Sequence, residues 1–219
     1  MRKRIGVLSV VMSTLAQTGP AAALEVPTPS ATIPAPAHAS GTGDTVLVHA
    51  GMYPESINLT GKIITLTRFA GPGATFVSNP LGMPGQVLCT GGETNSTSIS
   101  GFTFVGPSPT TGAYEARFVL AAGAAPTIIG NVFIGTATYM DFIRTYASGP
   151  PSLGPGPVIE GNIFLNGGAA IQAYAYSTLT IRDNVVQQCE SGIYASATSQ
   201  LTVSGNTILG CNYGVSVWV

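Results

Sequence analysis

The sequence predicts an all-β fold in which short strands form a parallel solenoid with coils of about 22 residues. First, segments of the C-terminal half repeat at a constant offset of about 22 residues. Second, apolar and polar residues alternate within each repeat, which is the period of a strand with one face inward. Third, only 8% of the 219 residues are charged whereas 28 are glycine. The chain therefore lacks the charged faces of long amphipathic helices and has many residues suited to tight turns.

Residues 1–23 have the order of a secretory signal peptide. Three basic residues at 2–4 precede an apolar run over 5–15, and small residues follow at 21–23. We predict cleavage after Ala23 and a secreted protein, extracellular or periplasmic; the alternative is a buried N-terminal helix. The apolar run is too short to cross a bilayer, so no membrane span is expected.

Residues 24–40 are rich in proline, alanine, threonine and serine. Pro27, Pro29, Pro34 and Pro36 disfavour a continuous helix. We interpret this stretch as a linker or a degenerate cap that precedes a β-solenoid domain over residues 41–219.

The repeat units follow one another along the rest of the chain. The strongest match aligns residues 179–184 with 201–206, and Asn162 precedes Asn184 by the same offset. Units at 98–104 and 127–133 have the same pattern at a wider spacing of about 30 residues. We expect longer loops between these units.

The opening of this domain, residues 43–55 followed by 57–66, resembles the first coils of pectate-lyase-like and NosD-like proteins. The resemblance covers roughly residues 41–219 and implies a right-handed parallel β-helix, a single-stranded solenoid. Such proteins usually begin with an amphipathic capping helix, whereas this chain has Pro34 and Pro36 in the corresponding stretch.

Four asparagines occupy one column of the repeat: Asn131, Asn162, Asn184 and Asn206. We expect a structural ladder in which each side-chain amide bonds to its neighbours while the asparagine adopts the left-handed backbone of a tight turn. The alternative is a ligand groove lined by asparagine.

Cys189 and Cys211 also share a column, one coil apart. Adjacent coils lie about 4.8 Å apart, a separation that permits either a disulfide or a stack of two thiols. Three cysteines leave at least one thiol unpaired within the chain. No metal site is expected, because there is no CxxC spacing and the two histidines lie far from this column in the sequence.

Aromatic residues gather on the last three coils. The candidate ligand-binding residues are Tyr174, Tyr176, Tyr194, Tyr213 and Trp218. Tyr174 and Trp218 share a column, and aromatic rings spaced along a rod can stack on sugar rings. The alternative is that these rings fill corners of the solenoid.

Charged residues offer little catalytic chemistry. The best candidates are Asp141, Glu160, Arg182 and Asp183, with a carboxylate as acid or base and Arg182 as the stabiliser of an oxyanion. The simplest role of Glu160 and Arg182, which are one repeat apart, is a surface ion pair. Residues 141–144 resemble a fragment of the catalytic segment of pectin-methylesterase-like proteins, with Arg144 where that family has an aromatic residue.

We therefore predict a secreted scaffold that binds polysaccharide, and as the alternative a polysaccharide lyase or carbohydrate esterase. No cofactor is expected; Ca²⁺ would be required only by the lyase alternative, as the resemblance implies. A net charge of −1 argues against nucleic acid. The last strand, 214–219, has no cap after it, which predicts an incomplete chain or end-to-end self-association.

Overall fold

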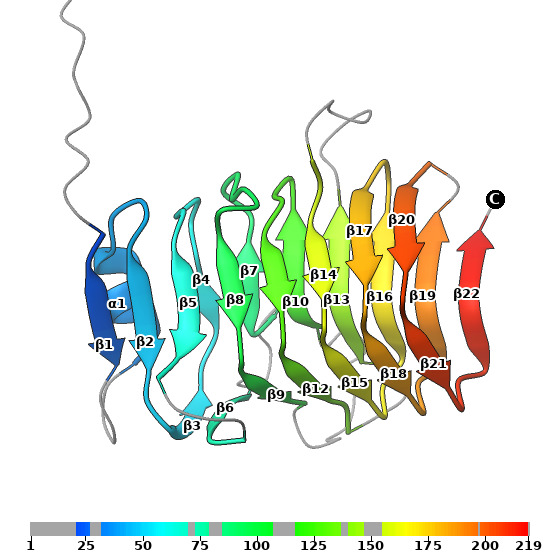
Figure 1. The fold of residues 1–219 in the computed structure, drawn as a ribbon, viewed down its shortest axis with the longest axis horizontal. Coiled ribbons are helices and arrows are strands. Elements are labelled where there is room, and N and C mark those ends of the chain that lie inside the picture. Colours follow the sequence, from blue (N-terminus) through cyan, green and yellow to red (C-terminus); the bar gives the residue numbers. More distant parts are fainter. Residues whose placement is uncertain are drawn as a thin grey trace, which may run out of the picture.

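A computed structural model describes residues 21–26, 32–69, 73–78, 85–106, 117–136, 140–146, 155–196 and 198–218. It confirms the predicted fold: the chain is a right-handed parallel β-helix of about seven turns, with successive turns about 24 residues apart. Each turn visits three parallel sheets in the same order, so that strands from successive turns stack side by side (Figure 1). Every strand pairing is parallel, as stacking of successive coils requires.

Three sheets make up the solenoid, and we call them A, B and C. Sheet A contains β1 (Ala23–Val26), β2 (Thr45–Val48), β5 (Thr65–Arg68), β8 (Ser98–Ser100), β11 (Thr127–Ile129), β14 (Val158–Glu160), β17 (Thr178–Arg182) and β20 (Gln200–Ser204). Sheet B contains β3 (Gly51–Pro54), β6 (Thr75–Ser78), β9 (Thr103–Val105), β12 (Val132–Ile134), β15 (Ile163–Leu165), β18 (Val185–Gln187) and β21 (Thr207–Leu209). Sheet C contains β4 (Ile57–Asn58), β7 (Val87–Cys89), β10 (Arg117–Ala122), β13 (Asp141–Tyr146), β16 (Ala169–Tyr174), β19 (Ser191–Ser196) and β22 (Tyr213–Trp218).

The predicted offset of 22 holds for the last coils and for the pairing of β1 with β2, but not for the coils between them. Asn162, Asn184 and Asn206 follow one another at that offset, whereas Asn131 precedes Asn162 by 31 residues. The longer insertions between earlier coils raise the mean spacing to about 24 residues.

The first coil begins earlier than residue 41. Strand β1 pairs with β2, and a short helix, α1 (Pro34–Ala39), lies beside them at the N-terminal end of the solenoid (Figure 1). Proline at the start of α1 is compatible with a helix, because the first turn has no intrahelical partner for its N–H groups. Ile33 and Ala37 are fully buried. Of the two interpretations given for residues 24–40, the described part is closer to the cap than to the linker, since it contains most of β1 and the short helix α1.

Residues 1–20 of the predicted signal peptide lie outside the described part of the chain. The predicted cleavage position, after Ala23, coincides with the start of β1, where Ala23 is paired with Thr45. Among the described residues, no helix has both the length and the apolar character needed to cross a membrane.

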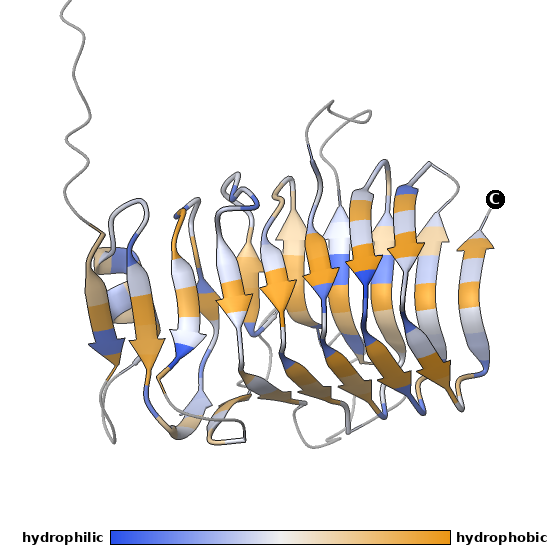
Figure 2. Ribbon diagram, in the orientation of Figure 1, coloured by the Kyte–Doolittle hydropathy of each residue, from blue (hydrophilic) through white to orange (hydrophobic). Residues whose placement is uncertain are grey.

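Apolar residues recur at matching positions on neighbouring strands, and the inward ones form the core (Figure 2). Phe104, Phe133 and Phe164 occupy one register column of sheet B, and their rings stack with centroids 5.0 Å and 4.9 Å apart. Phe118 and Phe142 from sheet C pack against this stack. The core is thus continuous along the solenoid axis.

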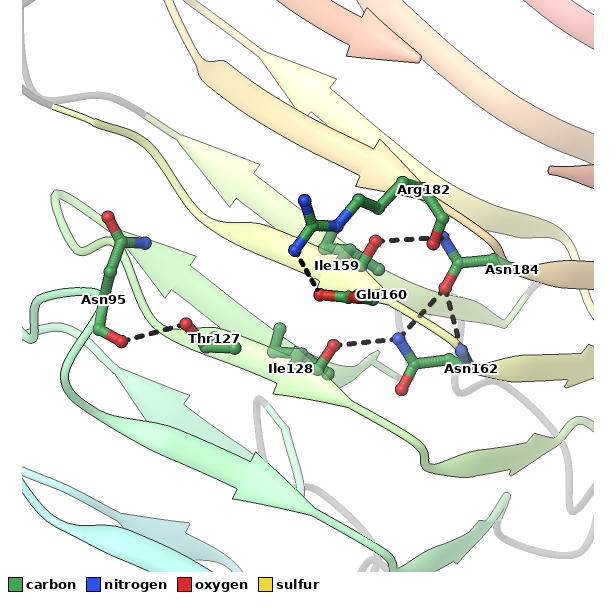
Figure 3. Close-up of polar contacts among 8 residues, drawn as sticks. All are labelled: Asn95, Thr127, Ile128, Ile159, Glu160, Asn162, Arg182 and Asn184. Carbon is green, nitrogen blue, oxygen red and sulfur yellow. Dashed lines mark hydrogen bonds and ion pairs between the residues drawn. The ribbon is translucent and has the colours of Figure 1, made fainter. Parts of the chain in front are cut away.

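The predicted asparagine column lies at the corner between sheets A and B. The Oδ1 of Asn162 accepts the Asn131 N–H at 2.9 Å. The Oδ1 of Asn184 accepts the Asn162 N–H in the same way, as Figure 3 shows. Each side-chain NH₂ also donates to a carbonyl of an earlier coil, as Asn162 does to Ile128. Asn131, Asn162 and Asn184 are almost fully buried, so these bonds satisfy backbone groups that water does not reach.

One part of the ladder prediction is wrong. The left-handed backbone belongs to the residue before each asparagine and not to the asparagine itself. These residues are Gly130, Gly161, Asp183 and Gly205, and Gly101 has the same conformation before Phe102. This arrangement explains Asp183 as a turn residue, since aspartate is among the few non-glycine residues that tolerate such a backbone.

Candidate functional site: the outer face of sheet C

The outer face of sheet C carries the richest polar and aromatic cluster among the described residues. In β13, Ile143 and Thr145 are buried while Arg144 and Tyr146 are partly exposed, so the latter two face outward. The same alternation places Gln172 and Tyr174 on the outside of β16 and Tyr194 on the outside of β19. The register aligns these side chains in two columns along the solenoid axis: Arg144, Gln172 and Tyr194 in one, and Tyr146 and Tyr174 in the other.

Three tyrosine rings form a continuous aromatic surface across three coils. The rings of Tyr146 and Tyr174 stack with centroids 5.6 Å apart and an interplanar angle of 16°. Tyr194 continues the row, with its centroid 5.7 Å from that of Tyr174 and its plane tilted by 50°. The Arg144 guanidinium lies 5.4 Å from the centroid of the Tyr174 ring, within range of a cation–π contact.

A hydrogen-bonded cluster adjoins the rings. Asp141 forms an ion pair with Arg144, and its Oδ1 accepts a bond of 2.8 Å from Gln172. Gln172 in turn accepts a 2.8 Å bond from the Nε of Arg144. Arg144 also donates to the Tyr146 hydroxyl at 3.2 Å. These contacts hold the guanidinium in one orientation beside the aromatic surface, because several of its donors are used at once.

Burial affects the pKa values of Asp141 and Arg144. The side chains of Asp141 and Arg144 are only 11% and 12% exposed. Burial raises the pKa of Asp141, although Arg144, the Ala169 N–H and Arg117 on the neighbouring strand all act to lower it. Burial acts to lower the pKa of Arg144, but the opposing effects of Asp141 and Tyr146 raise it overall. The guanidinium therefore stays charged, beside a carboxyl that is more easily protonated than a surface aspartate.

The four candidate catalytic residues do not come together. Asp141 belongs to the sheet C cluster, whereas Glu160 and Arg182 lie on sheet A. There Glu160 and Arg182 form the predicted ion pair between adjacent coils, with a distance of 2.6 Å and the arginine half-exposed (Figure 3). Asp183 occupies the turn after β17. The structure therefore places Asp141 on a different sheet from Glu160 and Arg182.

The aromatic candidates lie either on the strands of sheet C or, in the case of Tyr176, in a turn. Tyr174 and Tyr194 are part of the sheet C surface, and Trp218 continues the column of Tyr174 through Ser196 on the last coil. Trp218 is 73% exposed. Tyr213 begins the last strand and is also exposed, whereas Tyr176 lies in the turn after β16 with a φ of 60°. Tyr176 is therefore outside the strand face that carries the rings.

Sequence reasoning missed Tyr146 and Gln172 and placed Arg144 only as a departure from a family segment. These residues align with the next coil at an offset of 28, from Tyr146 to Tyr174, and not at 22. The sequence does contain a signal for this alignment. Tyr146 follows Ile143 by three positions, and Tyr174 follows Ile171 by the same three positions. Matching these two pairs would have brought Arg144 and Gln172 side by side.

The cysteines are thiols, and two of them share a column. Cys89, Cys189 and Cys211 are all free thiols, and Cys189 and Cys211 lie on adjacent coils as predicted from their column. Across the described ranges, no three His, Cys, Asp or Glu side chains are grouped so that they could hold a metal ion.

Comparison with known proteins finds one family model that matches the last coils. Residues 152–219 match the model described as "Right handed beta helix region". The structure is similar to that of a pectin methylesterase from carrot, with 14% sequence identity, a TM-score of 0.43, and coverage of 94% of this chain and 90% of that one. A search of curated proteins found no match. The matched region spans β14 to β22, and the whole described chain continues the same architecture as a right-handed parallel β-helix.

Proposed function

We propose that this protein binds a polysaccharide along the outer face of sheet C. The observation that carries the proposal is the row of Tyr146, Tyr174 and Tyr194 beside the bonded cluster of Arg144 and Gln172. Sugar rings have apolar C–H faces that stack on aromatic rings, and their hydroxyl or carboxylate groups accept bonds from arginine and amide donors. The partly exposed rings and the Arg144–Gln172 cluster lie side by side on one surface.

The direction of the row favours a linear polymer. The rings come from β13, β16 and β19, so the row runs along the solenoid axis and crosses one coil per ring. A glycan chain lying along the axis would meet the same kind of contact on each coil. The strands are rigidly paired, which limits the conformational entropy lost on binding.

Such a ligand fits the predicted secretion, since polysaccharides occur at and outside the cell surface. We accordingly propose an extracellular or periplasmic location. Detection of the protein in the culture medium or periplasm, with loss of the N-terminal residues, would test it. Retention of the whole N-terminal segment by an intracellular protein would contradict it.

The binding test uses matched tyrosine variants. Wild-type protein is titrated by calorimetry with an acidic oligosaccharide, oligogalacturonide, and a neutral one, cello-oligosaccharide. Tyr174→Ala should weaken binding at least about tenfold, equivalent to about 1.4 kcal/mol. Tyr176→Ala is the control, because Tyr176 lies two residues away in a turn outside the row. Absence of binding by the wild type, or equal loss in both variants, would refute the proposal.

Carbohydrate ester hydrolysis is the second candidate, and Asp141 is the observation that favours it. Its buried carboxyl has a raised pKa and bonds to both Arg144 and Gln172, which is the environment of a residue that exchanges a proton. The test is release of methanol from methyl-esterified pectin by the wild type and by Asp141→Asn. Polysaccharide binding without methanol release would contradict ester hydrolysis and support binding alone.

A lyase that depends on Ca²⁺ is less well supported by this cluster. Calcium requires six to eight oxygen ligands, commonly including several carboxylates. Among the described residues, this cluster has one carboxylate, that of Asp141, which forms an ion pair with Arg144. Calorimetric titration of the protein with Ca²⁺ tests this point directly.

A further inference from the structure

Two thiols lie next to each other on the last two described coils, between β18 and β19 and between β21 and β22. Gln187 pairs with Leu209, two residues before each cysteine, and Ser191 pairs with Tyr213, two residues after each. Cys189 and Cys211 are thereby held in register from both sides. Each sulfur also lies near the backbone carbonyl two residues earlier, at 3.5 Å for Cys189 and 3.7 Å for Cys211.

The two side chains are in contact and differ in burial. Cys189 is 3% exposed, whereas Cys211 is partly exposed. Burial raises the pKa of the Cys189 thiol to about 11; a backbone bond from Gly167 opposes this rise and contact with the Cys211 thiol adds to it. Adjacent coils are separated by about 4.8 Å, which lies within the Cα separation that a disulfide bridges without backbone movement.

We propose that Cys189 and Cys211 form a disulfide under oxidising conditions and that this bond fastens the last coil to its neighbour. With a small disulfide such as oxidised glutathione as the oxidant, the Cys211 thiolate attacks one sulfur and releases one glutathione thiol. The Cys189 thiolate then displaces the second glutathione from the mixed disulfide. The two protein thiols lose two electrons and two protons in total, and the oxidant is reduced to two thiols.

The third cysteine does not compete for either partner. Cys89 is fully buried on β7, and the residue opposite it on the next coil is Ala121. The strand register therefore favours a bond between Cys189 and Cys211 over any bond to Cys89.

The last coil is where a cross-link has the greatest effect. The side chains of β20, β21 and β22 are mostly exposed, in contrast to the buried inner columns of β17, β18 and β19. An element with few buried contacts opens most readily. A bond from Cys189 to Cys211 restricts that opening.

The test combines thiol mapping with hydrogen exchange on the full chain. The protein is equilibrated with oxidised glutathione at about pH 9, where more of the Cys189 thiol is ionised, and free thiols are then alkylated and mapped by mass spectrometry. We expect a peptide linked through Cys189 and Cys211, with Cys89 alkylated. Exchange of the β22 amides should slow by at least about tenfold on oxidation.

The double variant Cys189→Ser/Cys211→Ser is the control, and its β22 exchange should not respond to the oxidant. A persistent glutathione adduct on Cys211, a bond to Cys89, or two thiols that stay reduced would overturn the proposed pairing. A formed bond that leaves β22 exchange unchanged would overturn the proposed fastening of the last coil.

Discussion

At the scale of single residues, two consecutive residues with different roles form each turn between sheets A and B. The residue with positive φ turns the chain, and the following asparagine bonds to the coils on either side. The sequence predicted the amide ladder because the asparagines recur in one column. It could not assign the turn to the preceding residue, because glycine and asparagine are both common in left-handed turns.

Removing an inner ladder amide should be costly. Asn162→Ala leaves the buried Asn131 N–H and the Ile128 carbonyl without their partner. Each such group costs about 1–3 kcal/mol, so we expect a loss of about 3 kcal/mol in the free energy of unfolding. Urea denaturation measures this change. Asn206→Ala, at the more exposed end of the ladder, should cost clearly less, and equal losses would contradict the account.

The turn position predicts a different and smaller effect. Gly161 has a φ of +61°, and a Cβ added there would meet nothing within 4 Å. Gly161→Ala should therefore destabilise the protein through backbone strain alone, by about 1–2 kcal/mol. Gly161→Asn should lose less, because asparagine tolerates this backbone. Thermal unfolding of both variants is the measurement, and an alanine variant as stable as the wild type would show that the turn is not left-handed.

At the scale of elements, the coil repeat predicts which strands stack but not how far apart they lie in the sequence. The last three coils keep the offset of 22, so the ion pair of Glu160 with Arg182 could be predicted. The offset changes to 28 between Tyr146 and Tyr174, where a longer connection intervenes. A single fixed period therefore could not align Tyr146 and Gln172 with their neighbours. Asp141, Tyr174 and Tyr194 were identified, but not as members of one cluster.

The stacked phenylalanines of sheet B make a prediction about the core. Phe133 is fully buried and contacts rings on the coils before and after it. Phe133→Ala should reduce the free energy of unfolding by about 3–5 kcal/mol, because it removes buried surface and leaves a cavity. Phe69→Ala is the comparison, since that ring is 53% exposed and stacks on His49 at the surface. Calorimetry that gives similar losses for both would contradict a continuous core.

At the scale of the whole molecule, the solenoid presents two unlike ends. Helix α1 lies beside the first coil, whereas β20, β21 and β22 are the last strands of their sheets among the described residues (Figure 1). Val215 and Val217 continue core columns of sheet C and are more than half exposed. An apolar rung with unpaired backbone groups favours pairing with another chain.

We accordingly propose that the 219-residue chain self-associates through this last coil. Light scattering at about ten to fifty micromolar should show oligomers that grow with concentration. Val217→Lys should reduce their size, because a charge in the rung opposes edge pairing, whereas Tyr176→Lys in an exposed turn should not. A monodisperse monomer over this range would contradict the proposal.

A crystal structure with the tighter-binding of the two oligosaccharides would show whether the outer face of sheet C receives a polysaccharide. We predict sugar rings stacked on Tyr146 and Tyr174, with a polar group of the sugar within hydrogen-bonding distance of Arg144. The oligosaccharide should lie along the solenoid axis and cross β13, β16 and β19. A sugar bound instead on sheet A beside Glu160 and Arg182, with the tyrosine row empty, would contradict the account.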